Sequence, residues 1–174
     1  LSARIRQLPR ISLAQGAVKR MSLAGAQHKL AVVLADDELA EPMGARASTH
    51  ILKPEHPGED YPHSVANEWF VMRLARAMRL DVPDVQRSYV PEPVYLVSRF
   101  DRIQREGGWQ RRHVIDACQL LGLDRQYKYR EGSIDALAKI ARATRGVAIT
   151  RTRLFSWLVF NLLTGNGDAH LKNL

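Results

Sequence analysis

The pattern of hydrophobic positions changes its period partway along the chain. In the first part the apolar runs are short: residues 31–34 lead into the acidic turn 36–38, and residues 50–53 end at Pro54. Proline has no N–H group to donate to a strand ladder, so it closes a strand. Both runs are therefore predicted as β-strands.

A helical period begins at Ser64. From Val65 and Trp69 onward, apolar residues recur at spacings of three and four, which places them on one stripe of a helix. Ser64 suits the N-cap position, and Pro83 prevents the helix from continuing. We predict a helix over residues 65–80.

The pattern after this helix predicts a hairpin and then a helical region. Residues 85–89 and 94–97 read as two strands joined by a proline-containing turn, and Gly107-Gly108 is the strongest break in the chain. We therefore expect a β-rich lobe over residues 1–106 and a helical lobe over residues 107–174. The fold class that follows is α+β.

Three helices are predicted in the second lobe, near residues 115–121, 133–144 and 152–163. The last is apolar on nearly every side, from Leu154 to Leu163, and is expected to be a buried core helix. The same run is the longest apolar stretch in the chain, about half of the ~20 residues that a membrane-spanning helix needs. No association with a membrane is expected.

Composition narrows the class of protein. Of the 174 residues, 45% are hydrophobic and 25% charged, with 11 Gly and 8 Pro, which excludes collagen-like and disordered chains. The one cysteine, Cys118, excludes a disulfide framework, fits a cytoplasmic protein and is expected to be buried. The chain does not begin with Met and stops inside a motif, so we expect a piece of a longer protein.

The charge is basic but scattered. Lys and Arg outnumber Asp and Glu by 26 to 18, a net charge of +8, which favours phosphate-bearing partners. The densest clusters, Arg111-Arg112 and 151–153, are short. A solvated basic surface is therefore the simpler interpretation, and nucleic-acid binding stays open as an alternative.

The clearest chemical motif is D-x-H-x-x-N, which runs from Asp168 through His170 to Asn173 after the apolar helix. Phosphoryl transfer needs a carboxylate to orient the attacking hydroxyl and an amide oxygen to help hold Mg²⁺. Four residues separate Asp168 from Asn173, as in kinase catalytic loops. The alternative is a polar turn that only ends the helix.

Two weaker signals lie upstream. Residues 21–29 are rich in small side chains and let backbone N–H groups approach a phosphate, although an ordinary turn is the alternative. Lys53 ends a strand and Glu68 lies early in the next helix, which is the kinase arrangement of a phosphate-binding lysine and its glutamate. The alternative is a solvated lysine and a glutamate favoured by the helix dipole.

The order of these elements strengthens each of them. A small-residue loop, a strand lysine, a helix glutamate, an apolar strand and D-x-H-x-x-N follow one another as in a bilobal ATP-dependent phosphotransferase. Residues 94–101 then occupy the place of the strand and hinge that hold an adenine. Asp101 follows this hinge, and pairing with Arg99 or Arg102 is as plausible for it as a functional role.

The motifs together resemble the HipA family of bacterial serine/threonine protein kinases, which act as toxins and pair with a HipB-type helix-turn-helix antitoxin. The resemblance runs from about residue 20 to the end. It is carried by the following segments: 22–29, 50–54, Asn67-Glu68, 99–102, 116–119 with Gly122, Lys128-Tyr129 and 167–173.

The resemblance implies a bilobal kinase-like fold, ATP and Mg²⁺ as cofactors, and a role for each matching residue. Asp168 would be the catalytic aspartate, Asn173 a Mg²⁺ ligand, Glu68 the ion-pair partner of Lys53, and Ser22 the site of an inactivating autophosphorylation. The residues implied in nucleotide binding are Ala24, Gly25, Ala26, Gln27, His28, Lys29, Lys53, Ser98, Arg99, Phe100, His170, Leu171, Lys172 and Asn173.

The sequence also departs from the family pattern. Ser98 and His28 each stand where the best-known member has a glutamate, and the second metal-binding aspartate lies beyond Leu174. The fragment itself is therefore expected to be inactive even if its parent catalyses.

Three functions follow. The first is a kinase that transfers the ATP γ-phosphate to a protein hydroxyl, as the toxin of a toxin–antitoxin module. The alternative is an inactive basic binding module in an antitoxin–operator complex, which reaches DNA only through the antitoxin. A small-molecule phosphotransferase fits the other motifs less well. An aspartate after a short strand, about 15–30 residues beyond Asn173, would favour the first over the second.

Overall fold

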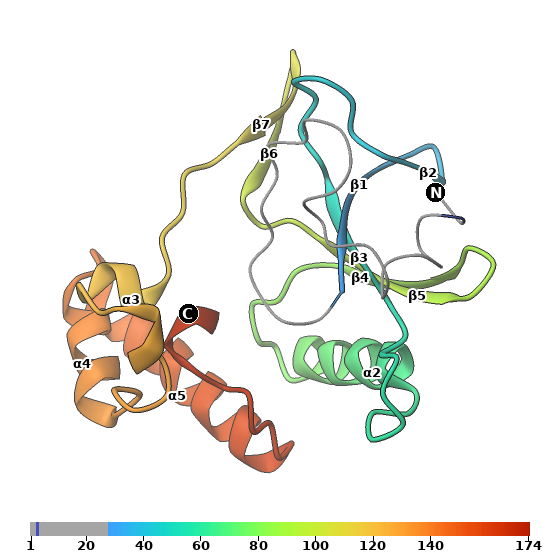
Figure 1. Cartoon of the computed structure of the whole chain (residues 1–174). Coiled ribbons are helices and arrows are strands. Elements are labelled where there is room, and N and C mark those ends of the chain that lie inside the picture. The colour runs from blue at the N-terminus through green and yellow to red at the C-terminus, as the bar shows by residue number, and fades with distance from the viewer. Residues whose placement is uncertain (1–2, 4–27) are drawn as a thin grey trace. The chain divides into compact units, whose positions relative to one another are not determined.

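The computed structural model describes residue 3 and residues 28–174. Residues 28–174 divide into two compact units: unit 1 comprises residues 28–76 and 81–112, and unit 2 comprises residues 77–80 and 113–174 (Figure 1). Each unit is described separately below.

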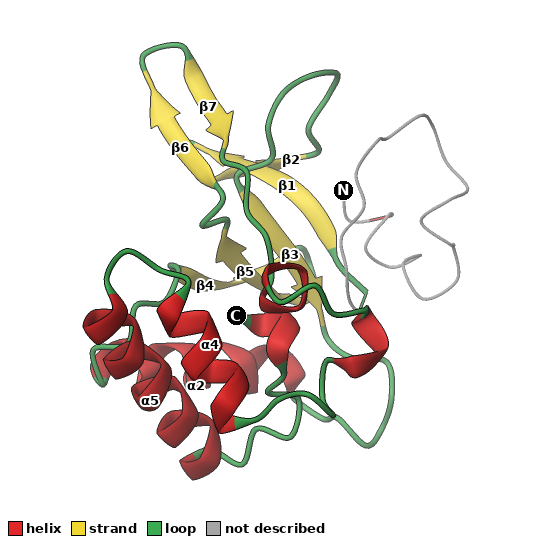
Figure 2. Cartoon of the chain, turned by 90° about the vertical axis from the view of Figure 1, so that its left-hand side faces the viewer, coloured by secondary structure: helices red, strands yellow, loops and turns green. Residues whose placement is uncertain are grey.

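Unit 1 contains an antiparallel sheet with the strand order β2-β1-β3-β5-β4 (Figure 2). Its strands are β1 (Leu30–Ala35), β2 (Glu38–Ala40), β3 (His50–Pro54), β4 (Val85–Tyr89) and β5 (Pro93–Ser98). The strands predicted at 31–34 and 50–53 are confirmed, and so is the 85–97 hairpin. Asp36 and Asp37 turn β1 into β2 with φ angles of 50° and 60°, a left-handed conformation that aspartate tolerates in tight hairpins.

Alternating side chains of the central strands form the core of unit 1. Leu30 pairs with Leu52, and Leu52 pairs with Leu96, so their side chains lie on the same face of the sheet. With Val32 and Val94 they make a buried cluster in which no member is more than 6% exposed. This core fixes the backbone on either side of Lys53.

Helix α2 (Ser64–Ala77) follows β3 in the chain and ends before residue 80, the predicted end. The carboxylate of Glu55 accepts hydrogen bonds from the Ser64 hydroxyl and from the Val65 N–H group. The carboxylate of Glu55 therefore binds one N–H group of the first turn, the role that the sequence had suggested for the Ser64 hydroxyl. Arg79, just after the helix, has a φ of 63°, which interrupts the helical path.

A second hairpin, β6 (Arg102–Arg105) and β7 (Gly108–Arg111), lies where we expected the boundary between lobes. Glu106 and Gly107 form the turn, and Gly108, which begins β7 and pairs with Arg105, has a φ of 105°, a value that L side chains rarely adopt. The glycine pair therefore lies at the tip of a hairpin. The two units divide after Arg112, not at the glycines.

Unit 2 is helical. It contains α3 (Ala117–Leu120), the 3₁₀ turns η1 (Arg125–Tyr127) and η2 (Leu171–Asn173), α4 (Ile134–Arg142) and α5 (Val147–Leu163). Asp116 and Gln119 form a capping box at α3, and the Ser133 hydroxyl caps α4. Cys118 is buried among small side chains of α3 and α4, as predicted, and burial raises the pKa of its thiol.

Helix α5 differs from the fully buried helix that we expected. Only Leu154, Phe160 and Asn161 are buried, whereas Phe155 and Leu162 are 66% and 77% exposed. An apolar sequence shows that a helix is able to pack on several sides. It does not show which of those sides the described residues actually cover. None of the helices in residues 28–174 is long and apolar enough to cross a membrane.

Candidate active site

In unit 1 the structure brings Lys53 and Glu68 together. Lys53 lies on β3 and Glu68 in the second turn of α2, and the Lys53 Nζ atom is 2.6 Å from Glu68 Oε2. Lys53 also lies over the ring of Tyr95, its cross-strand partner on β5, 5.6 Å from the ring centroid. Burial raises the pKa of the Tyr95 phenol, which keeps this neighbour neutral. The lysine is thus held from two sides.

A second ammonium group lies close enough to influence the first. Lys29 immediately precedes β1 and is half-buried. Burial lowers its pKa, the charge of Lys53 lowers it further, and Glu68 acts in the opposite direction. Two partly desolvated cations beside one carboxylate form a site that fits an anion such as a polyphosphate. His28 is half-buried beside Lys29 in the chain, whereas Ser22 and Ala24 to Gln27 lie outside the described residues.

The predicted hinge, Ser98 to Phe100, is held by backbone hydrogen bonds at the end of β5. The Ser98 N–H donates to Asp84 O at 2.8 Å, and the Arg99 N–H donates to Thr49 O at 2.9 Å. Phe100 is 72% exposed. The hinge backbone is therefore fixed on both neighbouring segments, while the Phe100 ring faces solvent.

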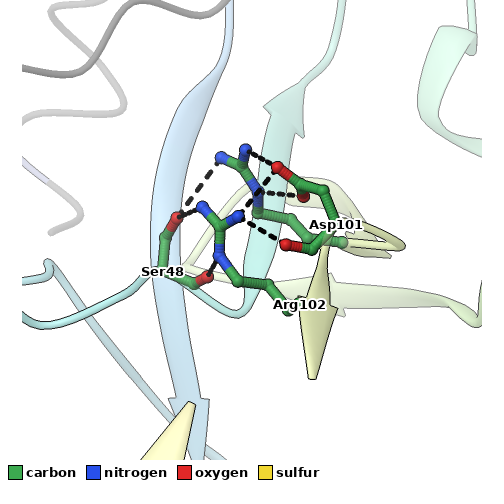
Figure 3. Close-up of polar contacts among 4 residues, drawn as sticks. Ser48, Asp101 and Arg102 are labelled. Atoms are coloured by element: carbon green, nitrogen blue, oxygen red, sulfur yellow. Dashed lines mark hydrogen bonds and ion pairs between the residues drawn. The ribbon is translucent and has the colours of Figure 1, made fainter. Parts of the chain in front are cut away.

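The guanidinium of Arg99 is engaged in an ion cluster, and Figure 3 labels the other members, Ser48, Asp101 and Arg102. It donates to both carboxylate oxygens of Asp101, at 2.9 and 2.7 Å, and to the Ser48 hydroxyl at 3.3 Å. Arg102 binds the same carboxylate at 2.7 Å and the Ser48 carbonyl at 2.7 Å. We expected Arg99 to contact the nucleotide, but its side chain is committed to Asp101; pairing of Asp101 with both arginines is confirmed.

The charged side chains of this cluster are largely shielded from solvent. The exposed fractions of the Arg99, Arg102 and Asp101 side chains are 15%, 4% and 16%. The hydrogen bond from Arg99 lowers the pKa of Asp101, burial opposes this shift, and the charges of both arginines add to it. The carboxylate therefore remains ionised and ties the hinge to the segment before β3.

In unit 2 the D-x-H-x-x-N motif forms a loop tied to the end of α5. Gly165, with a φ of 64°, lets the chain leave the helix. Buried Asn161 donates to Trp157 O, and Asn166 Nδ2 donates to Asn161 Oδ1 at 2.6 Å. Asn166 Oδ1 in turn accepts from the Asp168 N–H at 3.1 Å. A relay of amides thus sets the backbone of Asp168.

The loop brings Asp168 and Asn173 together. Asn173 Nδ2 donates to Asp168 O at 2.7 Å. This bond uses the amide nitrogen of Asn173 and leaves its Oδ1 atom as the group that can bind a cation, which fits the predicted Mg²⁺ ligand. The Asp168 carboxylate accepts a hydrogen bond from the Tyr129 hydroxyl, and its side chain is 74% exposed.

Three of the four residues between them, His170, Leu171 and Lys172, lie in different surroundings. His170 is 8% exposed, and its Nε2 atom is 3.7 Å from Asp168 Oδ1. Leu171 packs in the core of unit 2, and Lys172 forms an ion pair with Asp116. The side chains of Leu171 and Lys172 are therefore occupied, and only their backbones remain for the predicted nucleotide contacts.

Sequence reasoning did not find several residues that shape these sites. Asn161 lies within the apolar run 154–163 and was not singled out. A single amide side chain in such an apolar helix is a signal, because a buried polar group is normally hydrogen-bonded. Ser48, Asn166 and the Tyr129 hydroxyl act through partners that are distant in sequence or in another element. Within residues 28–174, no three His, Cys, Asp or Glu residues gather in an arrangement that could hold a metal ion.

The comparisons with known proteins agree with one another. The model of the HipA-like C-terminal domain matches residues 21–174. A protein of Sinorhizobium fredii named Putative kinase Y4mE is 44% identical over 160 residues, covering 88% of this chain and 38% of the relative. The serine/threonine-protein kinase toxin HipA of Shewanella oneidensis is 38% identical over 171 residues, covering 88% of this chain and 39% of the relative.

A solved structure extends the match to three dimensions. The Shewanella oneidensis complex of HipA, HipB and its operator DNA contains a chain that matches with a TM-score of 0.79 and 31% identity, covering 99% of this chain and 45% of that one. The predicted α+β, kinase-like fold class is thereby confirmed. This chain spans about two fifths of the length of the relatives named above. By family model, sequence and fold, the chain belongs to the HipA family.

Proposed function

We propose that this chain is the nucleotide-binding part and the catalytic loop of a serine/threonine protein kinase that transfers the ATP γ-phosphate to a protein hydroxyl. The observation that supports this most directly is the loop after α5, in which the Asn173 amide donates to the backbone carbonyl of Asp168, so that the two residues lie together at kinase spacing. Relatives named as kinases support the same chemistry.

In this proposal Lys53 binds the phosphates of ATP. Glu68, at 2.6 Å, holds the ammonium in place. Lys29 adds a second positive charge, and bound phosphates would relieve the repulsion between the two lysines. The side chain of Arg99 is held by Asp101, so the hinge segment 98–100 would bind the adenine through its backbone, at groups other than the Ser98 and Arg99 N–H groups, which are already bonded.

The carboxylate of Asp168 orients the acceptor hydroxyl and takes its proton. Asn173 would hold Mg²⁺ through its amide oxygen, since its nitrogen is bonded to Asp168 O. Mg²⁺ supplies positive charge that neutralises the phosphates during transfer. Electrostatic positioning by these groups carries most of the catalysis.

The same proposal extends to partners and regulation. The solved relative is a HipA–HipB–operator DNA complex, which supports a HipB-type antitoxin as the partner of this protein. The family resemblance adds a helix-turn-helix fold for that antitoxin and DNA contact only through it. The match of Ser22 to the family pattern supports autophosphorylation there as the off-switch. The protein would then act as the toxin of such a module in the cytoplasm.

The test uses the full-length protein incubated with ATP and Mg²⁺, with phosphate mapped by mass spectrometry. We expect phosphate on Ser22 in the wild type and none in Asp168→Asn. Asp135→Asn is the matched control, because Asp135 is an exposed carboxylate in the first turn of α4. A wild-type protein with no phosphate and no ATP-induced thermal shift would instead support the basic binding module.

A further inference from the structure

Tyr129 reaches the candidate catalytic aspartate from a different part of unit 2. It lies just after η1, 39 residues before Asp168, and its hydroxyl donates a hydrogen bond to Asp168 Oδ1. The roles proposed above for Asp168 and Asn173 leave this bond unexplained. A buried structural role does not explain it either, because the Tyr129 side chain is 51% exposed.

The tyrosine is held firmly by its surroundings. The His170 ring meets it edge to face, with 5.0 Å between centroids and an interplanar angle of 78°. The Lys128 ammonium lies over the same ring at 4.7 Å. The Leu171 N–H donates to Lys128 O at 3.1 Å, which ties the backbone of the tyrosine segment to the catalytic loop. The Tyr129 hydroxyl is therefore placed by the same loop that it contacts.

The other hydrogen bonds of Asp168 fix its backbone and not its carboxylate. Its N–H donates to Asn166 Oδ1, and its carbonyl accepts from Asn173 Nδ2. At the carboxylate, the Tyr129 hydroxyl is the hydrogen-bond donor that the structure shows among residues 28–174, with His170 Nε2 farther away at 3.7 Å. A carboxylate that is 74% exposed would otherwise rotate in solvent.

We propose that Tyr129 is a positioning residue for phosphoryl transfer: its bond to Oδ1 selects the rotamer in which Oδ2 of Asp168 receives the proton of the acceptor hydroxyl. The proposal rests on the proposed kinase function. As the acceptor oxygen bonds to the γ-phosphorus, the bond from that phosphorus to the ADP oxygen breaks, and the acceptor proton moves to Oδ2.

Tyr129 keeps its own proton throughout this step. The hydrogen bond to Asp168 raises the pKa of its phenol, so the group stays a donor at neutral pH. Its contribution is orientation, which acts on the rate of the chemical step and not on the binding of ATP.

The experiment compares Tyr129→Phe with the wild type in the full-length protein. We expect kcat to fall about tenfold, the effect of losing one hydrogen bond to a charged group, with the KM for ATP unchanged within about twofold and the same melting temperature. Tyr127→Phe is the matched control: it makes the same change two residues away, where the hydroxyl has no bond to Asp168 among those that the structure shows, and it should retain full activity.

A second readout is independent of turnover. In protein labelled with ¹³C at the tyrosine ζ carbon, the Tyr129 signal, assigned by its loss in Tyr129→Phe, should shift in Asp168→Asn. An unshifted signal, or unchanged kcat in Tyr129→Phe within an active kinase, overturns the positioning role alone. A wild-type protein with no Asp168-dependent transfer overturns the proposed function, and the positioning role with it.

Discussion

The two units hold their candidate site residues by different kinds of bond. In unit 1 the groups are ionic: Lys53 pairs with Glu68, and Asp101 binds Arg99 and Arg102. In unit 2 the Asp168 end of the catalytic loop is held by neutral amides and a phenol, whereas Lys172 of the same loop forms an ion pair with Asp116. The ion pairs of unit 1 bring opposite charges together as well as fixing the positions of the side chains. The hydrogen bonds of the unit 2 relay fix the position of Asp168, whose carboxylate is the charged group at the end of that relay.

The supports beneath these bonds differ as well. The unit 1 residues rest on a sheet whose aliphatic core is almost fully buried. The core of unit 2 mixes small residues of α3 and α4 with Ile140, Leu154 and Leu171, while α5 leaves large apolar side chains exposed. We therefore expect unit 1 to be sensitive to core packing and charge, and the loop of unit 2 to be sensitive to single hydrogen bonds.

The largest effect should come from Leu52→Ala. Leu52 is completely buried between β1 and β5 and is the residue next to Lys53. Removing its side chain from a packed core should lower the free energy of unfolding by about 2–5 kcal/mol, measured by denaturant titration. A loss below about 1 kcal/mol would contradict the view that this core supports the lysine.

The ionic cluster should give the next largest effect. Asp101→Asn leaves two nearly buried arginines with only a neutral partner, and should cost about 3 kcal/mol at neutral pH. Because folding lowers the pKa of Asp101, its contribution is present above the ordinary value of 3.8 and is lost as the pH falls through the lowered value. The unfolding free energy of wild type should therefore fall more steeply below pH 4 than that of Asp101→Asn. Parallel curves would contradict the ionic account.

These results bear on what the sequence can predict. Local patterns were sufficient for β1, β3 and the 85–97 hairpin, because alternation and turn residues act over a few positions. The pairing of Lys53 with Glu68 followed from the order of strand and helix. Lys172 could not be assigned in this way, because its partner Asp116 lies 56 residues away and no local pattern links them.

Two errors have a common physical origin. The glycines at 107–108 and the apolar run of α5 were interpreted from composition alone. Composition indicates which conformation a segment favours, but not which other segments pack against it. A glycine pair serves a hairpin turn as well as a linker. An apolar helix is likewise compatible with a covered or an uncovered face, and only the structure distinguishes them.

A smaller effect is expected in the relay of unit 2. Asn161→Ala removes an acceptor for Asn166 and a donor to Trp157 O at a buried position, and should lower the free energy of unfolding by about 1–3 kcal/mol. Hydrogen exchange at Asp168 should also become faster, since the relay holds its N–H group. Thr152→Ala, an exposed change on the same helix, is the control. Unchanged exchange at Asp168 would show that the loop does not depend on the relay.

The smallest effect is expected on the exposed face of α5, and it tests the comparison most directly. Leu162 has the same side chain as Leu52 but is 77% exposed, so Leu162→Ala should change the free energy of unfolding of this 174-residue chain by no more than about 0.5 kcal/mol. The same substitution, made with Phe155→Ser, should reduce binding of a hydrophobic dye, because exposed apolar area is what such dyes report. If Leu162→Ala instead cost as much as Leu52→Ala, this face would be packed in solution, and the contrast between the two units would lie in the residues that cover α5 and not in the way each unit builds its core.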